Sequence, residues 1–346
     1  MSEATFNPVR RVKASKIILP AVIGLGVVAY MIFRDFSPEA FYEIKKTFSS
    51  MSIVWLLAAI LCMIGRDLGY MMRIWLLSDY KLSWRQSFKV IMLWEFTSAV
   101  TPSAIGGTSV ATFYVHKEGL SVGRSSAIVM TTSLLDEMYF VIMFPLIILI
   151  VGSSRLFDVD LPGWTAQGVI TILWIGYFIK LVWAMLLSYG LFINPRGLSK
   201  LIFRLFHLPI LRRWKRSAGK AAVDIEIASE EMKSRKLTYW LKAFAGTFLS
   251  WTSRYWVVNF MLLAFIPLND HFLIFARQLV MWIAMLVSIT PGGSGIAEIT
   301  FNIFLNEFVV IVGLTSAMAL LWRLISYYPY LVVGALLAPK WVNDKL

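Results

Sequence analysis

Six long apolar runs alternate with charged segments along the chain. They cover residues 17–33, 53–77, 125–151, 168–193, 240–266 and 315–337. A helix that crosses the hydrocarbon core of a bilayer needs about 20 mostly apolar residues. The pattern therefore predicts an all-α polytopic membrane protein with about six full transmembrane helices, forming a single membrane domain over residues 1–346.

A further apolar stretch, roughly residues 272–313, is interrupted by a glycine-rich turn. Its sequence is Thr290-Pro291-Gly292-Gly293-Ser294-Gly295-Ile296-Ala297-Glu298. Proline disfavours helix at the preceding residue, and glycines permit a sharp reversal. A loop at membrane depth has to line a polar cavity or be buried in protein. We therefore predict a re-entrant helical hairpin, with Glu298 in the first turn of its outgoing helix.

A weaker copy of this turn lies 189 residues earlier, within residues 90–116, and reads Thr101-Pro102-Ser103-Ala104-Ile105-Gly106-Gly107-Thr108. Each turn follows a predicted span that contains an arginine, Arg66 in one case and Arg254 in the other. The free N–H groups after the last glycine of each turn would suit a phosphate. Two repeat halves, residues 53–151 and 240–338, are predicted.

The distribution of basic residues predicts the topology. Residues 194–239 form a polar linker with 11 Lys and Arg against four acids, and the chain begins with a basic segment. Because cytoplasmic loops are rich in Lys and Arg, this linker and both termini are predicted to be cytoplasmic, in the plasma (inner) membrane. The two halves would then cross the membrane in opposite directions, with hairpins entering from opposite faces. Inverted repeats with broken helices are typical of transporters.

The composition narrows the function classes. The formal charge of +13 could indicate binding to nucleic acid. In a chain that is 58% hydrophobic, however, the enrichment of Lys and Arg in cytoplasmic loops and the attraction to anionic lipid headgroups explain the charge better. The single cysteine, Cys62, excludes an intrachain disulfide, and the three histidines have no metal-ligand spacing. Neither a Gly-x-Ser-x-Gly elbow nor a phosphate-binding loop for ATP occurs. We expect no cofactor, no metal and no enzymatic activity.

The motif Pro291-Gly292-Gly293-x-Gly295-x-x-Glu298, with Pro102-x-x-x-Gly106-Gly107 and a later Leu135-Asp136, resembles a known family. It is the flippase-like integral membrane family, also called the lysylphosphatidylglycerol synthase transmembrane region. The resemblance implies an inner-membrane protein that moves a lipid or lipid-linked headgroup between leaflets. The soluble aminoacyl-transferase domain of bifunctional members is not expected here, because the 46-residue linker is too short for one.

Charged residues inside spans are rare and mark functional sites or internal ion pairs. The predicted substrate-binding residues are Arg66, Thr101, Pro102, Gly106, Gly107, Asp136, Arg254, Thr290, Pro291, Gly292, Gly293, Gly295, Glu298 and Arg323. The competing interpretation is structural, with Asp136 or Glu137 paired to Arg323.

Three functions remain open at this point. The first is the flipping of a phospholipid, an aminoacylated lipid or a lipid-linked headgroup, with phosphate-bearing membrane lipids as partners. The second is an intramembrane enzyme that acts on a lipid phosphate. The third is a non-transporting membrane partner of a cytoplasmic enzyme that docks on the basic linker.

Overall fold

The computed structural model describes residues 38–101, 108–157, 166–205, 215–285, 290–309 and 313–345, together with Gly26, Tyr30 and Ile311. The predicted first span, 17–33, lies outside these residues except for Gly26 and Tyr30. Pro102, Gly106 and Gly107 of the first turn lie outside them as well. The described residues contain no strand, which confirms the all-α prediction.

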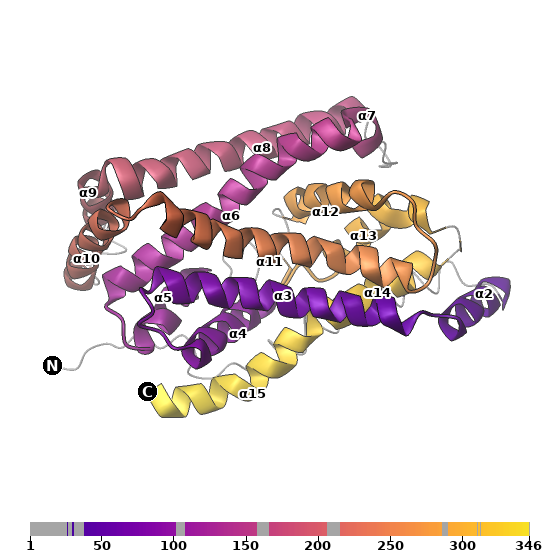
Figure 1. Ribbon diagram of the computed structural model, residues 1–346, viewed down its shortest axis with the longest axis horizontal. Coiled ribbons are helices and arrows are strands. Elements are labelled where there is room, and N and C mark those ends of the chain that lie inside the picture. The colour runs from indigo at the N-terminus through magenta and orange to yellow at the C-terminus, as the bar shows by residue number, and fades with distance from the viewer. Residues whose placement is uncertain are drawn as a thin grey trace.

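The predicted spans correspond to long helices (Figure 1). They are α3 (Ile53–Leu77), α6 (Val122–Val151), α8 (Ala166–Ser188) with its π-helical continuation η1 (Tyr189–Ile193), α11 (Leu237–Leu263), and α14 (Leu314–Ser326) followed by α15 (Tyr328–Lys345). Among the described residues, four helical stretches are long and apolar enough to cross a membrane: Ile53–Leu77, Val122–Val151, Leu173–Ile193 and Leu314–Asp344, the last of which combines α14 and α15. The chain is therefore embedded in a membrane.

The last predicted span, residues 315–337, is not one continuous helix. It breaks at Tyr327, whose backbone angles of φ −130° and ψ −56° are not helical. Pro329 stands at the second position of α15 and has no N–H to bond the carbonyl one turn earlier. The break turns the end of α14 toward the Gly292 region, where the cavity described below lies.

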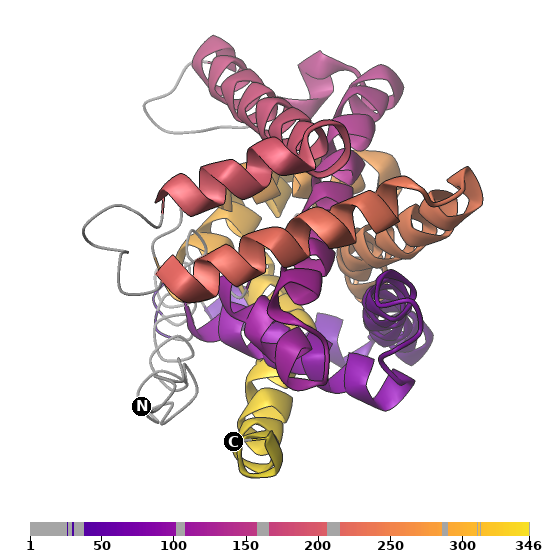
Figure 2. The same ribbon diagram turned by 90° about the vertical axis from the view of Figure 1, so that its left-hand side faces the viewer.

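Shorter helices complete the fold. The described residues of the two predicted hairpins form two helical pairs: α4 (Trp84–Val100) with α5 (Thr108–Lys117), and α12 (His271–Met285) with α13 (Ile296–Leu305), which is extended by η3 (Asn306–Phe308). The remaining helices are α2 (Pro38–Ser49), α7 (Ser153–Leu156), α9 (Pro195–Leu205) and α10 (Lys215–Lys233). Figure 2 shows α9 and α10 side by side across one end of the bundle, where the basic linker was predicted.

Helices α3 and α11 form an antiparallel pair along one side of the molecule (Figure 2). Ser52, just before α3, donates its backbone N–H to Ala264 O at 2.7 Å, just after α11. At the other end Tyr239 Oη donates to Leu76 O at 3.4 Å. Between these points a Cβ atom on Gly69 would lie 2.6 Å from Gly246 O, so the two backbones touch. Glycine at both positions permits this close approach.

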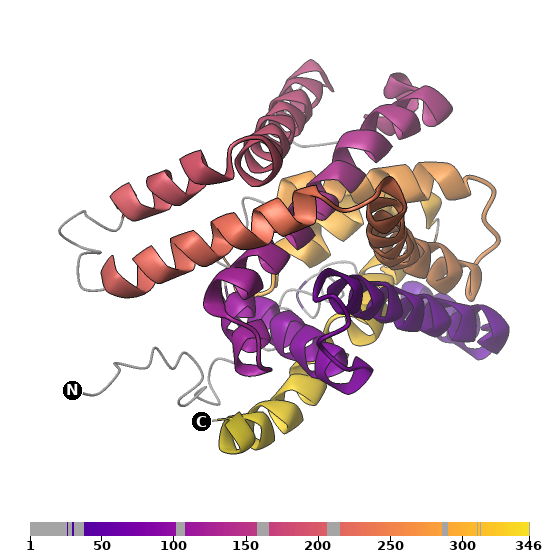
Figure 3. The same cartoon turned by 60° about the vertical axis from the view of Figure 1, so that its left-hand side comes forward.

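Because α3 and α11 run in opposite directions, the hairpins that follow them open at opposite ends. The α4–α5 pair opens beside α10, where Arg235 pairs with Asp79 of the α3–α4 loop at 2.8 Å. The α12–α13 pair opens beside α7, where Arg155 pairs with Asp270 at 3.0 Å. Figure 3 shows α15 running past α4 at the first of these ends. The two helical pairs therefore point toward each other within the bundle.

Candidate functional site

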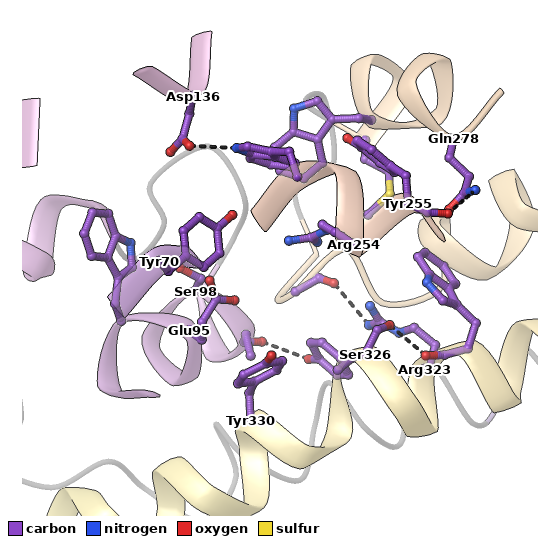
Figure 4. Close-up of a pocket in the computed structure, with 18 of the residues that line it drawn as sticks. Tyr70, Glu95, Ser98, Asp136, Arg254, Tyr255, Gln278, Arg323, Ser326 and Tyr330 are labelled. Carbon is purple, nitrogen blue, oxygen red and sulfur yellow. Dashed lines mark hydrogen bonds between the residues drawn. The ribbon is translucent and has the colours of Figure 1, made fainter. Parts of the chain in front are cut away.

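A cavity of about 320 Å³ lies between the helices of the two predicted halves. Residues of α3, α4, α6, α11, α12, α14 and α15 line it, together with Gly292 of the second turn (Figure 4). Five of its lining side chains are charged: Arg73, Glu95, Asp136, Arg254 and Arg323. The predicted residues Asp136, Arg254, Gly292 and Arg323 thus meet in one space.

One wall carries an ion pair between α3 and α6. Arg73 Nη1 lies 2.5 Å from Asp136 Oδ1 and also donates to Thr247 Oγ1 at 2.9 Å. The same Asp136 oxygen accepts a hydrogen bond from Trp251 Nε1 at 2.7 Å. The carboxylate is therefore fixed by three helices while it still faces the cavity, with 23% of its side chain exposed.

Arg66 lies behind the neighbouring wall and does not line the cavity. Its side chain is 2% exposed and pairs with Glu95 at 2.6 Å and Asp67 at 3.1 Å. Tyr330 of α15 contacts both Arg66 and Asp67, donating to the carboxylate at 2.7 Å. Arg66 is thus enclosed by two carboxylates and a phenol, and only Glu95 of the two acids is in the cavity lining.

The second turn is held together by Glu298 and Arg323. Glu298 is fully buried, accepts the Gly295 N–H at 2.6 Å and pairs with Arg323 Nε at 3.0 Å. Arg323 also donates to Gly292 O and Ser294 Oγ, each at 3.1 Å. The predicted pairing of Arg323 with Asp136 or Glu137 is wrong, because the second turn places Glu298 beside Arg323. Asp136 pairs with Arg73 instead, and Glu137 pairs with Lys180.

The turn backbone explains its glycines. Gly292, Gly293 and Gly295 have φ values of 58°, 68° and 87°, which L-residues rarely adopt. Their N–H groups bond internally: to Thr101 O, to Thr290 O and to the Glu298 carboxylate. The phosphate was expected at the N–H groups that follow Gly295, and of these the Ala297 N–H donates to Gly293 O at 2.8 Å. Thr290, Pro291, Gly293 and Gly295 shape the turn without lining the cavity.

The tips of the two helical pairs touch. Gly292 N–H donates to Thr101 O at 3.1 Å, and Tyr327 Oη donates to Ala99 O at 2.9 Å. The Tyr327 break in the last span thus places a phenol where α4 ends. The contact closes the space between the two tips beside the cavity.

Arg254 differs from the other cavity arginines. No acid among the described residues pairs with it. Its guanidinium instead lies over the rings of Trp251 and Trp282, 5.3 Å and 5.4 Å from their centroids. Figure 4 shows it pointing toward the side of the cavity where Tyr70, Glu95 and Ser98 lie.

Two hydrogen-bond donors beside Arg254 are also without partners among the described residues. They are Tyr255 Oη and Trp282 Nε1, both buried and both on side chains that line the cavity. An anion accepts hydrogen bonds, so a guanidinium, a phenol and an indole N–H gathered in one place favour an anionic ligand. No sequence signal singles out Tyr255 or Trp282 among the 13 tyrosines and 14 tryptophans of the chain.

Comparison with known proteins agrees with this architecture. The family model for the lysylphosphatidylglycerol synthase TM region matches residues 17–334. The chain belongs to this family. It is also similar to a UPF0104 membrane protein of Archaeoglobus fulgidus, with 27% identity over 341 residues, covering 94% of this chain and 98% of that protein. The resemblance noted from the Pro-Gly-Gly motif is thereby confirmed. Among the described residues no three His, Cys, Asp or Glu side chains could hold a metal ion.

Proposed function

We propose that this family member moves a phosphate-bearing lipid or lipid-linked headgroup between the leaflets, through the cavity that Arg254 lines. The observation that carries the proposal is an arginine with no acidic partner among the described residues, in a membrane-embedded cavity whose lining includes two side chains with hydrogen-bond donors that no described residue accepts from. A charge inside a membrane span is costly unless it is compensated. A bound anionic headgroup would supply the compensation that the described residues do not.

The chemistry of Arg254 suits a phosphodiester. The planar guanidinium can donate two parallel hydrogen bonds to two phosphate oxygens. Its flat faces already contact Trp251 and Trp282, so the side chain is held in place before the ligand arrives. The phenol of Tyr255 and the indole N–H of Trp282 supply further donors at the same place.

The opposed helical pairs support movement across the bilayer, not binding at one surface. The α4–α5 and α12–α13 pairs open at opposite ends, and their tips meet beside the cavity at Thr101 and Gly292. Separation of the tips toward one end and then the other would expose the cavity alternately to each leaflet. Such alternating access around a central site is typical of folds with inverted repeats.

The test is leaflet exchange in liposomes that contain the purified protein. Acyl-labelled phosphatidylglycerol is added symmetrically, and a membrane-impermeant quencher reports how fast inner-leaflet label reaches the outer leaflet. We expect exchange by the wild-type protein and at least a tenfold slower rate in Arg254→Gln, since loss of one charge-assisted contact removes about 1.5–3 kcal/mol.

The matched control is Arg155→Gln, which removes an exposed arginine outside the cavity. Its exchange rate should equal that of the wild type. Equal rates in Arg254→Gln and the wild type would contradict the assignment of the site. Chromatography of the lipid after the assay distinguishes a flippase from an enzyme, because an enzyme that acts on the lipid phosphate would change the headgroup.

A further inference from the structure

The charged side chains at and behind the cavity walls form a cluster in which positive and negative charges are equal in number but unevenly paired. This inner cluster consists of Arg66, Arg73, Arg254, Arg323, Asp67, Glu95, Asp136 and Glu298. Two of its pairs are matched one to one, Arg73 with Asp136 and Arg323 with Glu298. Within the described part of the chain, however, Arg66 pairs with two acids and Arg254 with none. An excess negative charge therefore lies at Asp67 and Glu95, and an excess positive charge at Arg254.

These two excess charges act on one another. The charges of Arg66 from its own helix, of Glu95 from α4 and of Arg254 from α11 act on Asp67, which also accepts a hydrogen bond from Tyr330 of α15. Arg254 thus supplies part of the compensation that the shared guanidinium of Arg66 cannot give to two acids. The arrangement holds only while Arg254 remains free of an anion.

Binding of an anion at Arg254 changes this balance. A phosphodiester carries one negative charge, so the inner cluster with its ligand would become negative by one. An uncompensated charge inside a membrane protein is strongly unfavourable. The carboxylates of Asp67 and Glu95 are 24% and 23% exposed and share one guanidinium, so one of them can accept a proton without leaving Arg66 unpaired.

We propose that the Asp67–Glu95 pair is a proton-binding site that loads when an anionic headgroup binds at Arg254. The inference rests on the proposed function and adds its coupling ion. One headgroup anion and one proton would cross together, and no net charge would move. The lone pair of one carboxylate oxygen takes the proton, and release on the other side restores the carboxylate. Tyr330, which contacts Arg66 and Asp67, keeps the pair in position.

The test uses the same liposomes with acyl-labelled phosphatidylglycerol and a pH difference across the membrane. Valinomycin with equal potassium on both sides holds the membrane potential at zero. Cotransport with one proton should concentrate the label in the leaflet that faces the alkaline side. The ratio should approach about tenfold for each unit of pH difference, the value set by the proton gradient itself. A protein that exchanges the lipid without protons leaves equal amounts of label in the two leaflets at every pH difference.

Variants locate the proton. In Asp67→Asn and in Glu95→Gln, Arg66 keeps one acid and no excess carboxylate remains. Each variant should therefore exchange the lipid but distribute the label equally between the two leaflets. Glu137→Gln is the matched control, because Glu137 pairs with Lys180 and does not line the cavity. It should keep the wild-type ratio. The fold of each variant is checked by its thermal unfolding midpoint in detergent.

Each result decides something. A gradient-dependent ratio in the wild type that both pair variants lose supports the inference. Wild-type exchange with equal leaflets at every pH difference overturns it and leaves the proposed function standing. A ratio that persists in both pair variants also overturns it, since the proton would then bind elsewhere. Absence of exchange in the wild type contradicts the proposed function and this inference together.

Discussion

Arg66 and Arg254 hold comparable positions in the two predicted halves, 188 residues apart on the antiparallel helices α3 and α11. Their surroundings are opposite. Arg66 is buried between Asp67, Glu95 and Tyr330, whereas Arg254 lies against two tryptophans with no acid among the described residues. The comparison teaches that the described residues compensate one arginine with two acids and the other with none, a difference that the sequence shows only in part, through Asp67 beside Arg66.

The sharpest test of this contrast is the stability of the two arginine variants. Arg66→Met should lower the free energy of unfolding by about 3 kcal/mol, because it leaves two partly buried carboxylates without their buried cation. Arg254→Met should change it by less than about 1 kcal/mol, since no ion pair is broken. Unfolding in mixed micelles of detergent and SDS measures both values.

A rescue variant separates charge from packing. The triple change Arg66→Met, Asp67→Asn and Glu95→Gln removes the acids together with the cation, so much of the lost stability should return. If the triple variant is as unstable as Arg66→Met alone, the loss came from packing. Equal losses in Arg66→Met and Arg254→Met would remove the contrast altogether.

Breaking the buried ion pair between Glu298 and Arg323 in the second turn should give the next largest loss of stability. Glu298→Gln keeps an acceptor for the Gly295 N–H but leaves Arg323 without its carboxylate. Because Gly292 O and Ser294 Oγ still accept from Arg323, we expect a loss of about 1.5–3 kcal/mol, no larger than at Arg66. Lipid exchange should slow only as far as the turn loosens, which distinguishes a positioning residue from one that binds the headgroup. A wild-type unfolding midpoint with exchange abolished would contradict this view of Glu298.

Much of the fold was predictable from hydrophobic pattern alone. The span over residues 53–77 coincides with α3, and the Pro-Gly-Gly turn leads into a helix whose third residue is Glu298. These features depend on local sequence: apolar length, a proline and the glycines that positive φ angles require. The break at Tyr327 also has a local cause, Pro329, but the apolar run across it concealed the break.

The pairing of charges could not be predicted in the same way. Asp136 and Arg73 are 63 residues apart, and their contact depends on how α3 and α6 cross. Asp67 directly follows Arg66 and the predicted span around Arg254 contains no acid, but neither fact shows that Glu95 also pairs with Arg66 or that Arg254 lines the cavity. The cavity donors Tyr255 and Trp282 come from neighbouring helices, α11 and α12. Which residues face one another is a tertiary property, and the sequence pattern carries no record of it.

The close contact between α3 and α11 predicts a graded series of glycine variants. A Cβ atom at Gly69 would lie 2.6 Å from a backbone oxygen, and at Gly246 it would lie 2.9 Å from one. At Gly65 the nearest atom, at 3.2 Å, is the hydroxyl of Ser253, a side chain that can rotate away. We expect Gly69→Ala and Gly246→Ala to cost about 1–3 kcal/mol by overpacking and Gly65→Ala to cost less. The same unfolding assay measures the series, and equal costs at all three positions would contradict a backbone contact.

The smallest predicted effect concerns the contact that joins the two helical tips. Tyr327→Phe removes the hydrogen bond to Ala99 O but keeps the ring and the Gly292–Thr101 bond. A single hydrogen bond contributes about 1 kcal/mol, so stability should fall only slightly. Because the bond ties the broken last span to α4, its loss should speed hydrogen exchange in the turn over residues 290–295. Tyr328→Phe is the control, since Tyr328 forms no hydrogen bond with the described residues through its hydroxyl. Faster exchange in the Tyr327 variant alone would show that the two halves are held together at their tips, where separation is needed if Arg254 is to face each leaflet in turn.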